Sequence, residues 1–204
     1  MTLAPWRSLL SRALHRNRSL PNARFVQLAT VRPDGSPANR TIVFRGFVGD
    51  QFCQNGILHD TLQFVTDRRS EKAIEIEHQA LGEVCWYFPK TREQFRLRGT
   101  LTLITEDTIT TSDRPWQKVR SHLWQELSDN ARIQFAWPHP GQSRAETDAF
   151  QIEPPDKTQP LPHFCALLLH PNVVDHLELR GEPQNRWHYE RDKTSEWQQK
   201  AVNP

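Results

Sequence analysis

Hydrophobic and polar residues alternate along most of the chain, which predicts a protein built mainly from antiparallel β-strands. We expect strands at residues 24–32, 37–47, 62–66, 83–88, 94–104, 164–169, 173–179 and 185–190. The sequence Arg32-Pro-Asp-Gly-Ser36 predicts a tight turn that joins the first two strands into a hairpin. Gly99, in the middle of a strand, indicates a bulge or bend in a curled sheet.

Helical periodicity adds a few peripheral helices to this sheet. Helices are expected at 5–15, from Asp67 or Ser70 to Gln79, and at 112–127. Residues 138–162 are rich in Pro, Gly, Gln and Asp, which predicts a long irregular loop. We therefore expect one β-barrel domain over residues 1–204, with an N-terminal helix and a basic loop in residues 1–20.

The composition indicates a soluble globular protein with an aromatic core. Hydrophobic residues make up 36% of the chain and the mean hydropathy is −0.72, so seven Trp and ten Phe must fill much of the interior. No stretch approaches the ~18 apolar residues that a membrane span requires, and no membrane association is expected. Cys53, Cys85 and Cys165 show neither disulfide nor zinc-ligand spacing, which favours a reducing cytoplasm.

The charge pattern does not point to nucleic acid. The formal net charge is only +2, and the N-terminal cluster of Arg7, Arg12, Arg16, Arg18 and Arg24 is interpreted as a solvated helix face with a basic loop. The nine histidines form no HxH or HxxxH pair, so no metal site is expected. No GxSxG nucleophile motif occurs either.

Two segments combine cations and hydroxyls in a way that favours a phosphate-bearing ligand. Residues 39–45 alternate like a strand and carry Arg40 and Arg45. Residues 66–72 end a strand in a polar turn and open a helix with Ser70 and Lys72. Cationic side chains, a hydroxyl and the amides of a helix start are suitable donors for a phosphate.

The order of these motifs resembles the pyridoxamine 5′-phosphate oxidase family and its flavin-binding split-barrel relatives. The resemblance is carried by 28–31 before the Pro-Asp-Gly turn, 40–45, 64–66, 70–73, Phe88-Pro89, 94–99, 161–164 and Asn185-Arg186. It covers roughly residues 22–190. The resemblance implies a mainly β protein with peripheral helices, an FMN-binding split β-barrel that forms a homodimer with two FMN molecules at the interface.

Site residues follow from this resemblance position by position. It implies that Arg40 reaches the FMN phosphate and that the segment through Arg45 lines the flavin. Ser70 and Lys72 match phosphate ligands, and Gln94 matches a glutamine that bonds the flavin. The resemblance gives the cofactor-binding set as Arg40, Thr41, Ile42, Val43, Arg45, Val65, Thr66, Ser70, Lys72, Gln94, Gln142, Ser143 and Arg186. Gln142 and Ser143 match a pair that the partner subunit donates, while Arg45 and Arg186 are expected near the substrate.

Two departures from the family pattern affect these expectations. Glu71 stands where the oxidase has a phosphate-binding arginine, and either Arg68 or Arg69 is a candidate replacement. The oxidase also carries an Arg-x-His pair that binds pyridoxal phosphate. We place that pair at residues 182–185, which contain neither residue, and so expect the pair to be missing.

Three functions remain open from the sequence. The first is a dimeric, cytoplasmic FMN-dependent oxidoreductase that acts on a small molecule, in which the protein supplies orientation and electrostatics. The second is a non-catalytic protein that binds a flavin or another phosphorylated ligand, which the missing Arg-x-His pair favours. The third, least supported, is a nucleic-acid or partner-binding module that uses the basic N-terminus.

Overall fold

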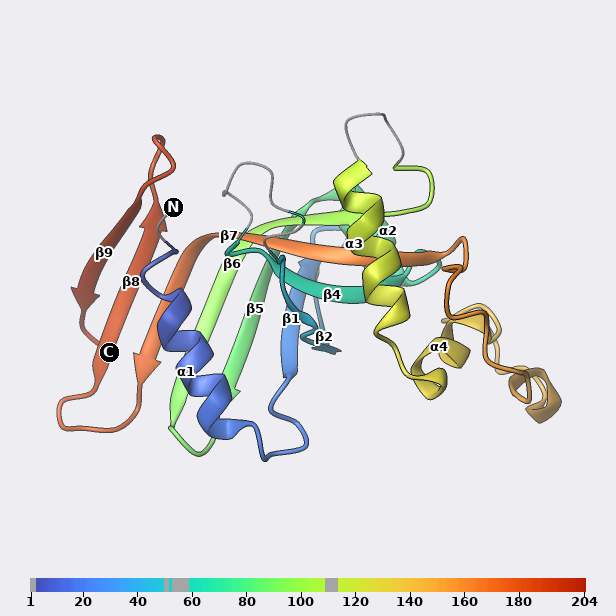
Figure 1. The fold of residues 1–204 in the computed structure, drawn as a ribbon. Coiled ribbons are helices and arrows are strands. Elements are labelled where there is room, and N and C mark those ends of the chain that lie inside the picture. The colour runs from blue at the N-terminus through green and yellow to red at the C-terminus, as the bar shows by residue number, and fades with distance from the viewer. Residues whose placement is uncertain (1–2, 50–51, 53–58, 109–113) are drawn as a thin grey trace.

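The computed structural model describes residues 3–49, 52, 59–108 and 114–204, which form a curled antiparallel sheet (Figure 1). The strands are β1 Phe25–Val31, β2 Pro37–Val43, β3 Gly46–Phe47, β4 Leu62–Asp67, β5 Leu81–Phe88, β6 Glu93–Ile104, β7 Phe164–Glu178, β8 Asn185–Arg191 and β9 Trp197–Val202. They follow the order β2-β1-β5-β6-β7-β4-β3, while β8 pairs with β7 and β9 with β8. The mainly β prediction is confirmed.

Strand β7 is continuous where the sequence predicted two strands. Its first half, Phe164–Leu169, pairs with β4, and its second half, Val173–Glu178, pairs with β8, while β6 runs along both halves. Pro171 falls between the two halves, where that edge of β7 has no paired partner among the described strands. Proline has no backbone N–H and so needs no hydrogen-bond acceptor at this unpaired edge, which explains why Pro171 does not end the strand.

The bulge predicted at Gly99 is confirmed. The register of β6 against β7 shifts between Arg98 and Gly99. A Cβ atom at position 99 would lie 2.0 Å from the backbone oxygen of His170, so the two backbones can approach this closely only at a glycine. The bulge bends the long strands and helps the sheet to curl.

Among the described residues, the helices around the sheet are α1 Arg7–Asn17, α2 Glu71–His78, α3 Arg114–Gln125, α4 Asp129–Ala136 and the 3-10 helix η2 Thr147–Phe150. The first three confirm predicted helices, although residues 112 and 113 at the expected start of α3 lie outside the described residues. Helix α4 and strand β9 were not predicted. Both are short, and β9 is largely exposed, so neither carries a strong hydrophobic pattern.

The sheet is buried on both faces along β7. Leu167 and Leu169 pack into one core cluster with Trp6, Leu10, Phe44, Phe64 and Trp86, and α1 covers that side. Ala166 and Leu168 pack into a second cluster with Trp124 and other residues of α3. Alternate residues of the strand thus face two cores, which explains the continuous apolar run at 164–169.

Other sequence features have simple outcomes. Cys165 is buried and Cys85 half-buried; both are free thiols, and burial raises the pKa of Cys165 to about 11. Cys53 lies outside the described residues. Across the described part of the chain, no helix combines the length and the apolar character that crossing a membrane requires.

Candidate functional site

Most of the predicted site residues line one cavity of about 550 Å³. It lies where the ends of β2 and β4, the start of α2 and the segment 131–150 meet. The predicted residues in its wall are Thr41, Ile42, Val43, Arg45, Val65, Thr66, Ser70, Lys72, Gln142 and Ser143. Gln142 and Ser143 line this cavity within the same chain. A volume of this size is in the range of ligand-binding cavities.

Lys72 provides an unusual positive charge in this wall. Its Nζ donates hydrogen bonds of 3.1 Å to the hydroxyls of Thr66 and Ser70, and no carboxylate lies within ion-pair distance among the described residues. Burial lowers the pKa of Lys72, and the nearby charge of Arg40 lowers it further. A bound anion would relieve both effects, so the geometry is suited to a phosphate.

Ser70 places this group of donors at the start of α2. It is the N-cap residue, with an extended backbone, but its side chain makes no capping bond. Its hydroxyl donates instead to the backbone oxygen of Asp67, at 2.6 Å, and accepts from Lys72. The helix start therefore keeps amide donors that a phosphate can use.

The segment after α4 supplies an aromatic wall that the sequence analysis did not assign. Trp137 and Phe150 are in edge-to-face contact with centroids 5.7 Å apart, and both line the cavity with Phe135. The indole Nε1 of Trp137 is buried and has no hydrogen-bond partner in the described part of the structure. A buried donor without a partner is unfavourable, so a ligand acceptor at this position would stabilise it.

Arg69, rather than Arg68, lies in the cavity wall. Its guanidinium pairs with Asp67, Nη2 to Oδ2 at 2.7 Å, and donates to the backbone oxygens of Phe135 and Trp137. Arg68 is exposed and pairs with Asp107. Arg69 therefore ties the aromatic wall to the end of β4, with its charge already matched by Asp67.

Arg40 lies outside the cavity wall, unlike the sequence expectation. Its Nη2 is 2.6 Å from Oε2 of Glu75, and Nη1 donates to Thr30, so the guanidinium is held against α2 and β1 and is not part of the cavity wall. Glu75 is nearly fully buried on α2. In this structure, the cations that line the cavity are Arg45, Arg69, Lys72 and Arg144, and Arg40 is not among them.

Gln94 and Arg186 also lie outside this cavity, but they lie on one face of the sheet. Gln94 pairs with Leu177 and Leu177 with Arg186, so the three form one row across β6, β7 and β8. The parallel row two residues along contains Arg96, Asp175 and His188. Directly paired residues point to the same face, so these polar side chains form one cluster.

Asp175 is the centre of this cluster, which borders a cavity of about 260 Å³. Arg186 binds it with two contacts, Nε to Oδ1 at 3.0 Å and Nη2 to Oδ2 at 2.9 Å, and Arg96 approaches to 3.3 Å. Burial raises the pKa of Asp175, but the bond from Arg186 and the charge of Arg96 outweigh it, and the net pKa is lowered. His188 Nδ1 lies 3.8 Å away.

Arg186 and His188 also correct one sequence expectation. The Arg-x-His spacing that was expected to be missing at 182–185 is present at Arg186-Trp187-His188, immediately after the β7–β8 turn. Alternate residues of a strand share a face, so both side chains reach Asp175. The error came from placing the motif before, rather than after, the turn.

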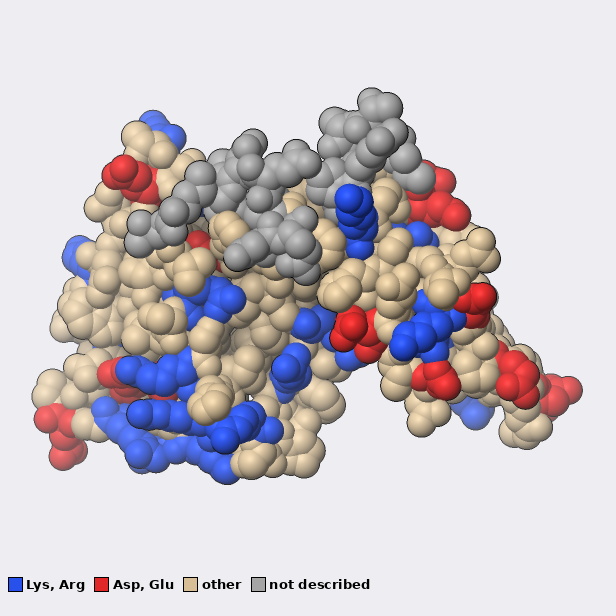
Figure 2. Space-filling view, in the orientation of Figure 1, with Lys and Arg blue, Asp and Glu red and all other residues tan. Residues whose placement is uncertain are grey.

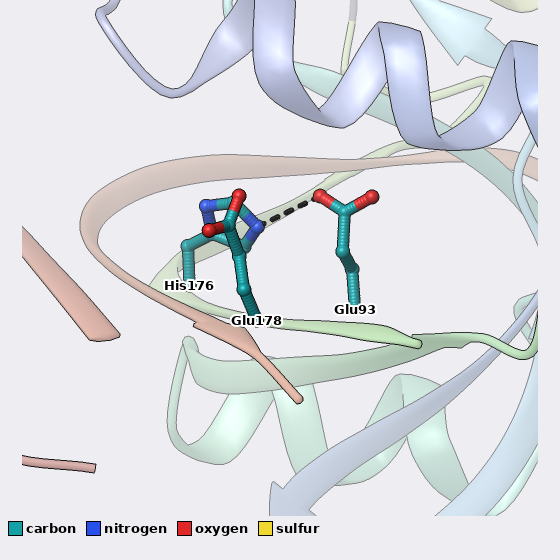
Figure 3. Close-up of side chains that lie close together, drawn as sticks. All are labelled: Glu93, His176 and Glu178. Carbon is teal, nitrogen blue, oxygen red and sulfur yellow. Dashed lines mark hydrogen bonds and ion pairs between the residues drawn. The ribbon is translucent and has the colours of Figure 1, made fainter. Parts of the chain in front are cut away.

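A separate group of possible metal ligands lies near the end of β7 (Figure 3). His176 Nε2 is 2.9 Å from Glu93 Oε2, and ligand atoms of Glu93, His176 and Glu178 lie within 4.8 Å of one another. His176 stacks on Phe95 at 4.0 Å. Arg12, Arg16 and Arg180 border the same small cavity as the two glutamates, and their charges disfavour a bound cation. We interpret Glu93 and His176 as a buried, hydrogen-bonded pair with a structural role.

Comparisons with known proteins agree on one family. The family model described as pyridoxamine 5′-phosphate oxidase, FMN-binding domain, matches residues 3–105. "Pyridoxine/pyridoxamine 5′-phosphate oxidase 2" of Arabidopsis thaliana is 35% identical over 99% of this chain and 98% of its own. The Rhizobium johnstonii "Pyridoxine/pyridoxamine 5′-phosphate oxidase" is 36% identical over 42% of this chain and 36% of its own.

Solved structures show the same fold. A "pyridoxamine 5′-phosphate oxidase-related, FMN binding protein" from Nostoc punctiforme superposes with a TM-score of 0.91 and is 56% identical, with full coverage of both chains. PhzG from Burkholderia lata, in complex with tetrahydrophenazine-1-carboxylic acid, superposes with a TM-score of 0.74 over 100% of this chain and 98% of its own, at 18% identity, which supports the fold alone. The expected split β-barrel is confirmed.

Proposed function

This chain belongs to the pyridoxamine 5′-phosphate oxidase FMN-binding family, and on that premise we propose that it is an FMN-dependent oxidoreductase whose cofactor occupies the Lys72 cavity. The observation that carries this proposal is the half-buried ammonium of Lys72, flanked by two hydroxyls and without a carboxylate partner in the described structure. A dianionic phosphate is a suitable partner for such a charge.

The remaining wall residues fit the rest of FMN. Ser70 and the first amides of α2 would hold the phosphate with Lys72, and Ile42 and Val43 would offer main-chain groups and apolar surface to the ring. The unpartnered Nε1 of Trp137 would donate to an oxygen of the cofactor. Bound FMN would supply the two-electron redox chemistry, and the protein would orient the substrate and exclude water.

The proposed substrate is a phosphorylated pyridoxamine or pyridoxine. Support comes from the name of the full-length Arabidopsis relative and from the Arg186–His188 pair, which has the spacing that the family uses for pyridoxal phosphate. The non-catalytic alternative relied on the absence of this pair and loses that argument. Oxidation requires the substrate carbon to lose a hydride and the amine or hydroxyl to lose a proton.

A homodimer is part of the proposal. Arg186 and His188 border a different cavity from Lys72 within one chain. In the dimer that the family resemblance implies, the Arg186 cluster of one copy approaches the FMN cavity of the other. Each active site would then combine the phosphate-binding donors of one chain with the substrate-binding cations of its partner.

The test is to load the purified protein with FMN and supply pyridoxamine 5′-phosphate or pyridoxine 5′-phosphate in air. The proposed function predicts one FMN per subunit, a bleached flavin spectrum when substrate is added without oxygen, and aldehyde formation when oxygen is admitted. Bound FMN that neither substrate reduces would exclude the proposed substrate class. If no electron donor other than dithionite reduces the bound FMN, the function that remains is that of a non-catalytic binding protein.

A further inference from the structure

A second cavity, of about 750 Å³, lies between α1 and the strand ends that face it. We name it the α1 groove. Its wall consists of Arg7, Ser11, Leu14, His15, Arg18, Ser19, Leu20, Pro21, Ala23, Arg24, Phe25, Val43, Phe44 and Phe47. The α1 residues in this wall are spaced three or four positions apart, so a single face of the helix forms one side of the groove.

The wall of the groove is cationic. It contains Arg7, Arg18 and Arg24, and no acidic residue is among the described residues that line it. Arg18 and Arg24 form no ion pair within the described structure. The guanidinium of Arg18 hydrogen-bonds to His15. Figure 2 shows Lys and Arg gathered along this side of the molecule, over and below α1. A concave surface with one sign of charge concentrates ligands of the opposite sign.

Arg7 is the most deeply placed of these cations. Burial lowers its pKa to about 10, and the charge of Asp60 offsets this only in part. Its Nε is buried and has no hydrogen-bond partner in the described part of the chain. An anion in the groove would restore to this guanidinium part of the stabilisation that it loses by leaving water.

The floor of the groove is aromatic. Phe44 and Phe47 are in edge-to-face contact at 5.0 Å, and the guanidinium carbon of Arg7 lies 3.0 Å from the centroid of Phe47. Phe25 at the rim is 49% exposed, which is unusual for a large apolar side chain beside a cavity. Phe44 is buried and Arg7 covers one face of Phe47, so Phe25 is the ring with open surface for a planar group to pack against.

We propose that the α1 groove binds a planar aromatic anion, at a site separate from the FMN cavity. The aromatic body packs against the exposed ring of Phe25 at the rim, and the phosphate, sulfonate or carboxylate group contacts Arg18, Arg24 and Arg7. Two features connect the groove to the FMN cavity: Val43 lines both, and the charge of Arg24 lowers the pKa of Arg45. An anion bound to Arg24 would therefore weaken the repulsion that Arg24 exerts on Arg45.

The shape of the surface favours a small molecule over nucleic acid. The arginines on the other face of α1, Arg12 and Arg16, border a different cavity that contains Glu93 and Glu178. The arginines of α1 are therefore divided between this groove and a second cavity that contains two carboxylates, and they do not all line one groove for a nucleic-acid backbone. The α1 groove has the volume that cofactors and metabolites occupy.

The proposal is tested by calorimetric titration of the FMN-saturated protein with 1-naphthyl phosphate, at 50 and 200 mM salt. Inorganic phosphate, 1-naphthol and a single-stranded oligonucleotide serve as parallel probes. The test variant is R18Q/R24Q, and the matched control is R12Q/R16Q on the other face of the same helix. Both remove two charges from exposed positions, and FMN stoichiometry verifies that each variant is folded.

We expect one naphthyl phosphate per subunit, with affinity reduced about tenfold or more in R18Q/R24Q and within about twofold of wild type in R12Q/R16Q. Naphthol and inorganic phosphate should each bind much more weakly than the combined probe. The proposal is overturned by no binding of naphthyl phosphate to the wild type, by equal losses in both variants, or by phosphate alone binding as tightly. Tighter, steeply salt-dependent binding of the oligonucleotide would instead indicate a nucleic-acid surface and also overturn it.

Discussion

Arg40 and Glu75 form an ion pair beside the Lys72 cavity, with Nη2 of the arginine 2.6 Å from Oε2 of the glutamate. Thr30 donates to the same carboxylate oxygen at 2.5 Å, and Glu75 is nearly fully buried. The pair joins β2 to α2, the elements that carry Ile42 and Lys72 of the cavity wall. It therefore connects the stability of the sheet to the position of Lys72.

Replacement of Arg40 tests this connection. R40A should lower the free energy of unfolding by about 3 kcal/mol, because it leaves the buried carboxylate of Glu75 with only the more distant cation of Arg32, at 3.8 Å. The double variant R40A/E75Q should recover part of that loss, which urea unfolding of the FMN-free proteins would measure. Weaker FMN binding by R40A at unchanged stability would show instead that Arg40 leaves Glu75 to bind the phosphate.

Glu75 should also make stability depend on pH in the acid range. Burial raises the pKa of Glu75, but the bonds from Thr30 and Arg40 outweigh it, and the net pKa is below its ordinary value of 4.5. Because the folded-state pKa is the lower one, the stabilisation is complete above about pH 4.5 and is lost as the pH falls through the folded-state value. Urea midpoints should fall less steeply below pH 4.5 in E75Q than in the wild type.

Lys72 should govern cofactor affinity rather than folding. K72A should weaken FMN binding by about 2 kcal/mol, roughly thirtyfold, because it removes a charge-assisted contact to the phosphate. The FMN-free variant should be no less stable than the wild type, since burial already disfavours this ammonium. Flavin fluorescence titration measures the affinity. K118A, at an exposed position of α3, serves as the control. Equal affinities in K72A and K118A would contradict the phosphate assignment.

Arg186 and His188 should separate turnover from cofactor binding. R186A and H188A should each lower kcat/KM for pyridoxamine 5′-phosphate about tenfold or more while FMN stoichiometry stays at one per subunit. R191A, on the opposite face of the same strand, should retain activity. If R191A loses as much activity as the other two, the effect belongs to the strand and not to this pair.

Gly99 should tolerate no side chain. G99A places a methyl group 2.0 Å from the backbone oxygen of His170, so the bulge must open. We expect a loss of about 3 kcal/mol in unfolding free energy, or failure to fold. G35A provides the comparison: its backbone is left-handed with φ of 83°, but nothing lies within 4 Å of an added Cβ, so the loss should be about 1 kcal/mol. Similar values for both variants would mean that β7 can move away from β6.

Local patterns were sufficient for most of the fold. Alternation predicted the strands of the hairpin 24–47, and the Pro-Asp-Gly turn fixed where it reverses, because both signals depend on neighbouring residues alone. Alternation could not show that β7 continues through Pro171, since that depends on which strands lie beside it. Helix α4 and strand β9 were not predicted, because few of their residues are buried and their hydrophobic patterns are weak.

The same division applies to the site. Thr66, Ser70 and Lys72 are close in sequence, and the strand-to-helix turn alone brings their polar atoms together. The role of Arg40 depended on Glu75, which lies 35 positions away, and the aromatic wall depended on Arg69 bonding to Trp137, 68 positions away. No spacing rule in the sequence records such pairs.

The sequence by itself determined most of the elements, the family resemblance and the turn at 66–72 that brings Lys72 together with two hydroxyls, because each depends on contacts between residues a few positions apart. Tertiary structure decided which cations are available to a ligand. A charged side chain near a cavity is free only if no buried carboxylate is closer, and that is a property of the packed chain. Thus Arg40 and Arg186 are matched by Glu75 and Asp175, while Lys72 retains its charge for a ligand.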